Sequence, residues 1–324
     1  MSEPRLVGDI GGTYARFALG LAGQRPGVPR RFACADYEGP EEAIRAFLAD
    51  MDGSPAAAAI AVAAPVTGDA ITMTNHPWRF SVERLRAGLG LARLEVVNDF
   101  TAIALALPRL GPDDLDKLGG GEPAAGAAMA VLGPGTGLGV SGLIPGGGGW
   151  AAISGEGGHV DAAPWPGREA AVVERLRRRF GHVSRERLLS GPGLVSIYLS
   201  LAEIEGRPPT ATPLPADVAA WAQEGDALAG EAAGMFSAML GAAAGDLALT
   251  LGARGGVFIA GGVVPGLGAA FDRDAFRRRF AAKGRFAAYL EAIPSYLVTG
   301  PNPALIGLAA LLDQDRGGGP TGGP

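Results

Sequence analysis

The sequence contains the same local pattern twice, and this repetition is the feature that most limits its fold. LVGDIGGTYARFAL (residues 6–19) and VLGPGTGLGVSGLI (residues 131–144) each combine an apolar strand, a glycine-rich turn and a second strand. Each segment therefore predicts a β-hairpin. Two such hairpins indicate an approximate internal duplication, in which each hairpin opens one domain and the two turns face each other.

The rest of the chain alternates strands with helices, which predicts two α/β domains. The chain of 324 residues is also longer than one hydrophobic core usually supports, so we expect a ligand cleft between two lobes. The polar run 109–126 is the expected crossover between the lobes. We place a smaller domain at 1–109, completed by 301–316, a larger domain at 110–300, and a disordered tail at 317–324. Helices are expected at 41–50, 81–88, 100–107, 168–180, 226–251 and 303–312, and further strands at 57–64, 94–97 and 255–259.

Composition excludes several classes of protein. The formal charge of -5 provides no overall basic field for nucleic acid or an anionic membrane. Cys34 is the only cysteine, so no internal disulfide can form, and no signal peptide is evident. We therefore expect a cytoplasmic protein. The uncharged stretch 123–154 is long enough for a membrane span, but its repeated glycines and two prolines predict strands and turns instead.

The first glycine-rich turn has the composition of an anion site. Its residues are Gly8, Asp9, Ile10, Gly11, Gly12 and Thr13. Backbone N–H groups in such a turn can approach phosphate without obstruction by Cβ atoms. A carboxylate beside phosphate needs a bridging cation, so Asp9 predicts Mg²⁺, bound directly or through water. An ordinary tight hairpin remains the alternative.

The second turn offers the same backbone donors without a carboxylate, through Gly135, Thr136 and Gly137. Residues 137–142 also match the dinucleotide fingerprint, with Glu156 about twenty residues on. That fingerprint requires a helix after the turn, whereas residues 140–144 favour a strand. Neither lysine lies in a Walker A context, so a P-loop enzyme is excluded.

Four further groups could contact a ligand. Asn98 and Asp99 lie between a strand and a helix, where Asp99 could act as a base and Asn98 could bond a hydroxyl; a helix cap is the alternative. Glu156 and His159 lie in a glycine-rich loop suited to sugar hydroxyls, while a metal site of His159 with Asp161 is a weaker alternative. Glu186 could add a carboxylate, although alone it has the pattern of a solvated helical residue. Gly261 and Gly262 could admit adenine or only close packing of a strand and a helix.

Together these motifs resemble the bacterial ATP-dependent glucokinases of the actin-like hexokinase superfamily. The resemblance runs from about Leu6 to Leu312 and includes TNHPW, NDFTAIALALP, GTGLGV, GEGGHVDAAP, HVSRERLLSGPG, GGVFIAGGVVPG and GRFAAYLEAIPSYLVTGPNPALIG. It implies a two-lobed actin-like ATPase fold of the duplicated ribonuclease H-like type, a homodimer, and lobes that close over glucose. The cysteine-rich zinc motif of the related ROK sugar kinases is absent from the sequence.

The resemblance also implies a role for each motif residue. Asp99 falls on the general base for the glucose 6-hydroxyl, and Asn98, Glu156, His159 and Glu186 fall on positions that hold the other hydroxyls. The turn from Gly8 to Thr13 falls on the phosphate site for MgATP, Gly135 to Gly137 on the second phosphate turn, and Gly261 and Gly262 on the adenosine motif. Tyr14 and Pro134 depart from the family pattern beside the two turns. A kinase for another hexose and a non-catalytic hexose sensor remain the alternatives.

Overall fold

The structure is a computed structural model that describes residues 3–51, 54–74, 76–146 and 149–314. The predicted disordered tail at 317–324 lies outside the described residues. So do the last two residues of the segment 301–316 that was expected to complete the smaller domain.

The chain forms two compact units. The first contains the described residues up to Gly111, Gly146–Ser154 and the described residues from Gly300 onward. The second contains Pro112–Pro145 and Gly155–Thr299. The segment 146–154, which the sequence analysis placed in the larger domain, therefore belongs to the first unit. Its strand packs there on the 99–106 helix, where the Thr101 and Ser154 hydroxyls lie 3.1 Å apart.

The first unit is built on a five-stranded sheet with the order β3-β2-β1-β4-β7. β1 and β2 form the predicted antiparallel hairpin, in which Ile10 pairs with Ala15. β1, β4 and β7 run parallel, and Ile10, Val62 and Asn98 lie in register across them. The turn after β1 and the Asn98–Asp99 pair therefore end at the same edge of the sheet. The strands are β1 (Arg5–Ile10), β2 (Tyr14–Gly20), β3 (Arg30–Ala33), β4 (Ala57–Val62) and β7 (Arg93–Asn98).

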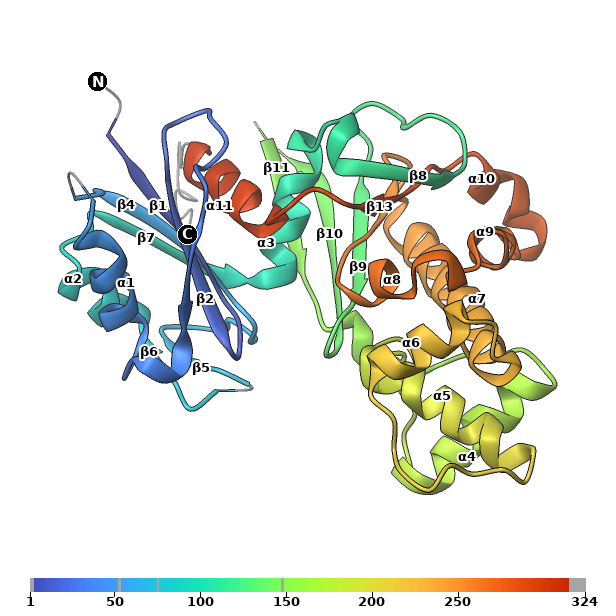
Figure 1. The fold of residues 1–324 in the computed structure, drawn as a ribbon. Coiled ribbons are helices and arrows are strands. Elements are labelled where there is room, and N and C mark those ends of the chain that lie inside the picture. Colours follow the sequence, from blue (N-terminus) through green and yellow to red (C-terminus); the bar gives the residue numbers. More distant parts are fainter. Residues whose placement is uncertain (1–2, 52–53, 75, 147–148, 315–324) are drawn as a thin grey trace, which may run out of the picture. The chain divides into compact units, whose positions relative to one another are not determined.

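Helices cover both faces of this sheet. On one face Val7 and Ala59 pack with Leu305 and Leu308, and on the other Phe17 and Phe47 share a core. Figure 1 shows the C-terminal helix α11, in red, beside α3. The unit also has a small antiparallel hairpin of β5 (Ala70–Thr72) and β6 (Arg79–Ser81). The helices are α1 (Pro40–Leu48), α2 (Val82–Gly88), α3 (Asp99–Ala106) and α11 (Pro303–Asp313).

The second hairpin lies in a six-stranded sheet with the order β11-β10-β9-β12-β13-β8. β9 and β10 are antiparallel, and Pro134 pairs with Leu138 next to the turn. The described residues of the uncharged stretch 123–154 thus form strands and turns, as predicted. β8 lies in the run expected to be a crossover, because an edge strand tolerates the polar side chains found there. The strands are β8 (Leu115–Gly119), β9 (Met129–Pro134), β10 (Leu138–Gly146), β11 (Gly149–Ser154), β12 (Val257–Ile259) and β13 (Ser295–Val298).

A long helix, α7, forms the centre of the second unit. It spans Ala227–Leu251, close to the predicted 226–251. The Asp226 side chain caps its start by accepting from the Ala229 N–H at 2.8 Å, and Gly252 caps its end with φ +61°. It packs against α5, α6 and α9. Within the described ranges α7 is the one helix long and apolar enough to cross a membrane, but 61% of its most apolar window is buried inside the structure.

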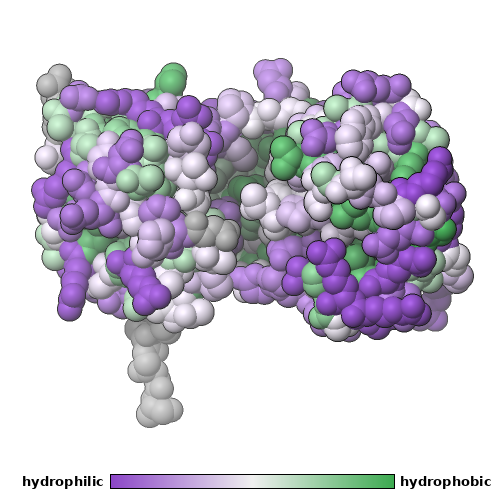
Figure 2. All heavy atoms as spheres, turned by 60° about the horizontal axis from the view of Figure 1, so that its bottom comes forward, coloured by the Kyte–Doolittle hydropathy of each residue, from purple (hydrophilic) through white to green (hydrophobic). Residues whose placement is uncertain are grey.

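The other helices of this unit surround α7. They are α4 (Arg168–Phe180), α5 (Gly191–Ile204), α6 (Pro215–Gln223), α8 (Val263–Leu267), α9 (Arg273–Ala281) and α10 (Ala287–Glu291). Short 3₁₀ helices occur along the chain at Cys34–Asp36, Leu107–Arg109, Pro112–Asp114, Gly157–His159, Gly268–Ala270 and Gly284–Phe286. Hydrophilic residues cover much of the face shown in Figure 2, as expected when apolar side chains fill interior cores.

Candidate active site

The first glycine-rich turn is held in place by Cys34, the residue that follows β3. The Gly11 N–H donates to the Tyr14 carbonyl at 3.0 Å, and the Cys34 N–H donates to the Thr13 carbonyl at 2.9 Å. The Cys34 thiol donates to the Gly11 carbonyl at 3.6 Å. These bonds engage the carbonyl groups of Gly11 and Thr13 and the N–H group of Gly11 within the protein. They leave the N–H groups of Gly12 and Thr13 as the candidate anion donors.

Gly8 and Ile10 belong to the strand and not to the tip of this turn. A Cβ on Gly8 would lie 2.7 Å from the Phe17 ring, so close packing explains this glycine. Ile10 is fully buried in the core, and only its backbone could face a ligand. Tyr14, the departure from the family pattern, is partly exposed and lies under the Arg31 guanidinium, 4.4 Å from the ring centre.

Asp9 and Asp99 form an electrostatically coupled pair in the first unit. Asp9 pairs in register with Arg16 across the hairpin, and their charged groups lie 3.6 Å apart. Burial raises the pKa of Asp9, an effect that the Arg16 charge partly offsets. Burial, followed by the negative charge of Asp9, raises the pKa of Asp99 to about 6. A carboxylate with such a pKa can accept a proton near neutral pH more readily than an ordinary aspartate.

Asp99 owes its position to the start of α3. Asn98 is the N-cap, and its side-chain oxygen accepts from the N–H groups of Phe100 at 2.9 Å and Thr101 at 3.3 Å. Asp99 Oδ1 also accepts from the Phe100 N–H, at 2.9 Å. The alternative interpretation of Asn98 as a helix cap is therefore what the structure contains. Its Nδ2 donates to the Ala64 carbonyl at 3.4 Å, and a contact from the same amide to sugar remains a prediction.

These two carboxylates are the residues best placed to hold a cation. Mg²⁺ in nucleotide enzymes usually takes one or two carboxylates, with water and phosphate oxygens completing its octahedron. Over the described ranges no group of three or more His, Cys, Asp or Glu side chains could hold a metal. The donor set thus fits an ion that arrives with a nucleotide. It does not fit a metal held by the protein alone, and the alternative metal site of His159 with Asp161 gains no support.

The second glycine-rich turn opens onto a pocket of about 450 Å³ in the second unit. Gly135 and Thr136 line it, together with Gly262. The Gly135 N–H donates to the Gly137 carbonyl at 2.8 Å and so closes the turn. A Cβ at Gly135 or Gly262 would meet no protein atom within 4 Å, so the chain itself does not require glycine there. Close approach of a ligand does provide a reason.

The neighbouring glycines have structural reasons instead. Gly261 has φ +83°, and a Cβ there would overlap the Pro134 carbonyl. A Cβ at Gly137 would overlap the Glu186 carboxylate. Residues 138–146 are a strand, as predicted, so the dinucleotide fingerprint is excluded because no helix follows the turn.

The sequence analysis missed most of this pocket's wall. α6 provides Ala216, Ala219, Ala220 and Gln223, whose spacing places them on one helical face. That spacing of small residues is a signal visible in the sequence, although it is also common in packed helices. The remaining residues come from the starts of α5 and α6 and from α8: Gly191, Pro192, Leu194, Pro215, Val263 and Gly266.

Glu156 and His159 lie together around a short 3₁₀ turn. The His159 N–H donates to the Glu156 carbonyl at 3.0 Å, and both residues are exposed. Asp161 pairs with His182 at 2.7 Å, which directs it to a different imidazole. Among the contacts of the described residues, the side chains of Glu156 and His159 are engaged by no hydrogen bond. They are available to a ligand.

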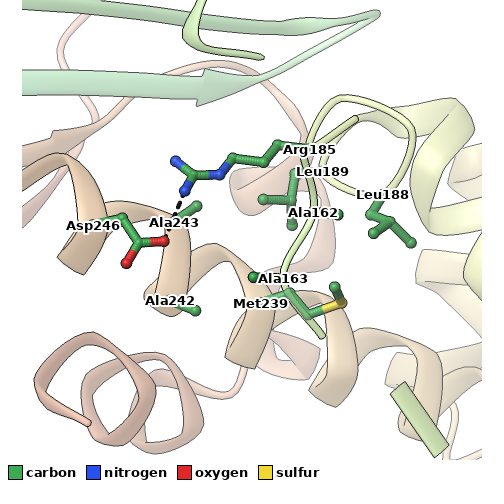
Figure 3. Close-up of a pocket in the computed structure, with 9 residues that line it drawn as sticks. All are labelled: Ala162, Ala163, Arg185, Leu188, Leu189, Met239, Ala242, Ala243 and Asp246. Carbon is green, nitrogen blue, oxygen red and sulfur yellow. Dashed lines mark hydrogen bonds and ion pairs between the residues drawn. The ribbon is translucent and has the colours of Figure 1, made fainter. Parts of the chain in front are cut away.

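Glu186 is not the solvated helical residue that its local pattern suggests. It lies before α5, is half-buried, and its Oε2 accepts from the Leu138 N–H at 2.9 Å. Its own N–H donates to the Gly158 carbonyl at 2.9 Å, which places it beside the Glu156–His159 loop. Figure 3 shows the neighbouring Arg185 reaching Asp246 of α7, at 2.7 Å. Tertiary contacts thus unite Glu186, the loop and the second turn, which lie far apart in the sequence.

Comparison with known proteins agrees with this geometry. Residues 6–315 match the family described as Glucokinase. The chain is 51% identical over 320 residues to a glucokinase of Paramagnetospirillum magneticum (98% of this chain, 99% of the relative) and 51% identical over 320 residues to one of Aromatoleum aromaticum (97% and 96%). A solved glucokinase from an Antarctic psychrotroph superposes with a TM-score of 0.89 at 35% identity, covering 96% of this chain and 99% of that one. The predicted two-lobed actin-like ATPase fold is thereby confirmed, and the chain belongs to the glucokinase family.

Proposed function

We propose that this protein is an ATP-dependent glucokinase that transfers the γ-phosphoryl group of ATP to the 6-hydroxyl of glucose, giving glucose 6-phosphate and ADP. The observation that carries the proposal is Asp99, a carboxylate whose pKa is raised to about 6 at the N-terminus of α3. It lies at the same sheet edge as the glycine turn after β1. A proton acceptor beside a phosphate turn is the arrangement that phosphoryl transfer to an alcohol requires.

In the proposed reaction Asp99 removes the proton of the 6-hydroxyl as that oxygen attacks the γ-phosphorus. The bond from the γ-phosphorus to the bridging oxygen breaks, and ADP leaves with that electron pair. No covalent enzyme intermediate is needed. Gly12 and Thr13 of the first glycine turn, and Thr136 and Gly137 of the second, would donate N–H groups to the phosphate oxygens, because the N–H groups of Gly11 and Gly135 are already bonded within their turns. Gly262 and the α6 face would receive the adenosine.

Asp9 is the proposed partner of Mg²⁺, directly or through water. When bound, the ion would neutralise charge on the phosphates. It would also relieve the repulsion between Asp9 and Asp99. The raised pKa of Asp9 shows that this carboxylate is costly to ionise without a cation beyond Arg16.

Glu156, His159, Glu186 and Asn98 are the proposed sugar ligands. Glu156 and His159 support this assignment because their polar groups are exposed and uncommitted among the described contacts. Carboxylate and imidazole groups together can both accept from and donate to hydroxyls. We also infer a cytoplasmic homodimer that catalyses the entry of glucose into glycolysis.

The test is sugar-dependent ADP release by the purified protein with Mg²⁺ and ATP across a panel of hexoses. We expect glucose to give the highest kcat/KM, since sites built to bond hydroxyls reject analogues that leave polar groups unpaired. Higher kcat/KM with mannose or an amino sugar would move the assignment to another hexose kinase. Binding of both ligands without ADP release would identify a sensor.

The assignment of the base is tested by Asp99→Asn. The variant keeps the size of the side chain and should remain folded while kcat falls by about 10² to 10⁴. Full activity in a folded Asp99→Asn protein would refute Asp99 as the base.

A further inference from the structure

We propose that Glu186 holds the second phosphate turn in place, in addition to contacting the sugar, so that the nucleotide pocket depends on a side chain of the sugar site. The inference rests on the proposed function, because it takes the pocket beside Gly135 as the nucleotide site. It adds a positioning role that sugar binding alone does not require.

The Glu186 carboxylate is packed against two consecutive residues at the end of the turn. Its Oε2 accepts from the Leu138 N–H at 2.9 Å. Leu138 is only 5% exposed, and a buried N–H that loses its acceptor is costly. At the preceding residue, a Cβ on Gly137 would overlap the same carboxylate oxygen. The absence of a side chain at Gly137 is thus what lets Glu186 reach the turn.

The segment that carries Glu186 also holds the start of the turn. The Gly191 N–H donates to the Gly135 carbonyl at 2.8 Å. The Ser190 hydroxyl donates to the Glu186 carbonyl at 2.8 Å and accepts from the Gly193 N–H at 3.0 Å, which caps α5. Both ends of the turn that lines the pocket are therefore fixed by residues 186–191.

The same segment is hydrogen-bonded to the loop of residues 156–160, which carries Glu156 and His159 and which we call the sugar loop. The N–H groups of Arg185 and Glu186 donate to the carbonyls of Val160 and Gly158, each at 2.9 Å. A Cβ on Gly158 would overlap the Leu138 carbonyl, so the sugar loop also lies directly against the residue after the turn. A movement of the Glu186 side chain would therefore affect both the second phosphate turn and the sugar loop.

An ion pair of Arg185 holds the segment that carries Glu186 in place. Arg185 reaches Asp246 of α7, at 2.7 Å, as Figure 3 shows. Lys283 binds the other Asp246 oxygen at 2.5 Å. The backbone that carries Glu186 is thus attached to the central helix of its unit, and its carboxylate has a fixed base from which to hold the turn.

The substitution Glu186→Gln would separate the contact with the turn from the contact with the sugar. With Oε2 bound to Leu138, the contacts among the described residues leave Oε1 for a ligand. A glutamine can accept from the Leu138 N–H through its amide oxygen, but it then presents an NH₂ donor to the sugar instead of a charged acceptor. Alanine removes both contacts.

The experiment is calorimetric titration of ADP with Mg²⁺ into the sugar-free protein. We expect Glu186→Ala to weaken ADP binding about tenfold, the usual effect of one lost hydrogen bond, and Glu186→Gln to bind ADP like the wild type. His159→Ala, a sugar-loop variant without a contact to the turn, should also bind ADP like the wild type. Steady-state kinetics should then show a raised KM for glucose in Glu186→Gln and in His159→Ala.

Wild-type ADP affinity in a folded Glu186→Ala protein would overturn the proposal, and so would equal losses in all three variants. If circular dichroism shows that Glu186→Ala is unfolded, Gly137→Ala decides. Its methyl group displaces the carboxylate and should weaken ADP binding, whereas Gly230→Ala, in α7 and outside the pocket, should bind ADP like the wild type. Normal ADP binding by folded Gly137→Ala would overturn the proposal. If the proposed function itself is wrong, the result will be different: the wild-type protein will bind no ADP, or will release no ADP from ATP when glucose is present.

Discussion

Asp99 combines a structural position with a chemical property. The cap by Asn98 fixes the start of α3, and the resulting turn buries the Asp99 carboxyl near a second negative group. The hydrogen bonds from the Phe100 N–H and Asn98 lower its pKa, but burial and Asp9 outweigh them. The residue is therefore a better base than a solvated aspartate while remaining ionised for the most part at neutral pH.

The pH dependence follows from this balance. Activity should fall by about tenfold per pH unit below about pH 6, because a protonated Asp99 cannot accept the hydroxyl proton. The measurement is the rate between pH 5 and 8 with glucose and MgATP both well below their KM values, so that the pH profile reports the ligand-free enzyme. An acid limb centred near the ordinary aspartate value would contradict the assignment.

The contribution of Asp9 to that pKa can be isolated in the ligand-free protein. Asp9→Asn removes a negative neighbour, so the pKa of Asp99 should decrease, whereas Asp9→Glu retains the charge and should leave it raised. Carbon-13 NMR titration of the carboxyl groups measures the shift, and Asp99→Asn identifies the signal. Equal Asp99 pKa values in Asp9→Asn and wild type would show that burial acts alone.

At the scale of elements, α6 forms one wall of the pocket that we propose as the nucleotide site. Its small side chains would leave room for a flat base between the helix and the Gly262 turn. Ala220 is exposed and faces the pocket, so a larger side chain there enters the cavity without disturbing the core.

Ala220→Leu should therefore raise the KM for ATP about tenfold and leave the KM for glucose near its wild-type value, because the added methyl groups occupy adenosine volume. Ala211→Leu is the matched control, since Ala211 is exposed outside the pocket. Steady-state kinetics with each substrate varied in turn provides both constants. A change in the glucose KM alone would show that this cavity is not the nucleotide site.

At the scale of the whole chain, the first unit is complete only when the C-terminal helix joins the N-terminal sheet. α11 lies so close to α3 that a Cβ on Gly307 would overlap the Ala102 carbonyl. The salt bridges of Asp313 with Arg5 and Arg109, both 2.7 Å, fasten the end of this helix. The two ends of the sequence thus contribute to one core.

Gly307→Ala should destabilise the protein by about 1–3 kcal/mol, because the added methyl group overpacks the contact between the helices. The control is Gly230→Ala in α7, where a Cβ meets nothing within 4 Å; it should be neutral or stabilising by up to about 1 kcal/mol. Thermal unfolding of both variants measures the difference. If Gly307→Ala and Gly230→Ala had equal melting temperatures, the close packing at Gly307 would be contradicted.

The sequence by itself determined the local elements. Alternating apolar residues beside glycine turns identified both hairpins, and helical spacing identified helices such as those at 81–88 and 226–251, because these signals act between residues close in the chain. Motif resemblance identified the family and named the candidate residues. The edge strand β8 and the helices α5 and α6 were missed, since polar edge strands and helices rich in small residues carry weak periodicity.

Only the tertiary structure decided what these residues share. Burial and the charge of Asp9, which is far away in the sequence, raise the pKa of Asp99. The position of Glu186 came from two hydrogen bonds, one from its N–H to the Gly158 carbonyl and one from the Leu138 N–H to its carboxylate. The tertiary structure also separated Gly135 and Gly262, where a Cβ would meet no protein atom within 4 Å, from Gly8, which packing explains, and from Gly261, which packing and a positive φ explain. Desolvation and steric overlap depend on atoms brought together by folding, so no local pattern contains them.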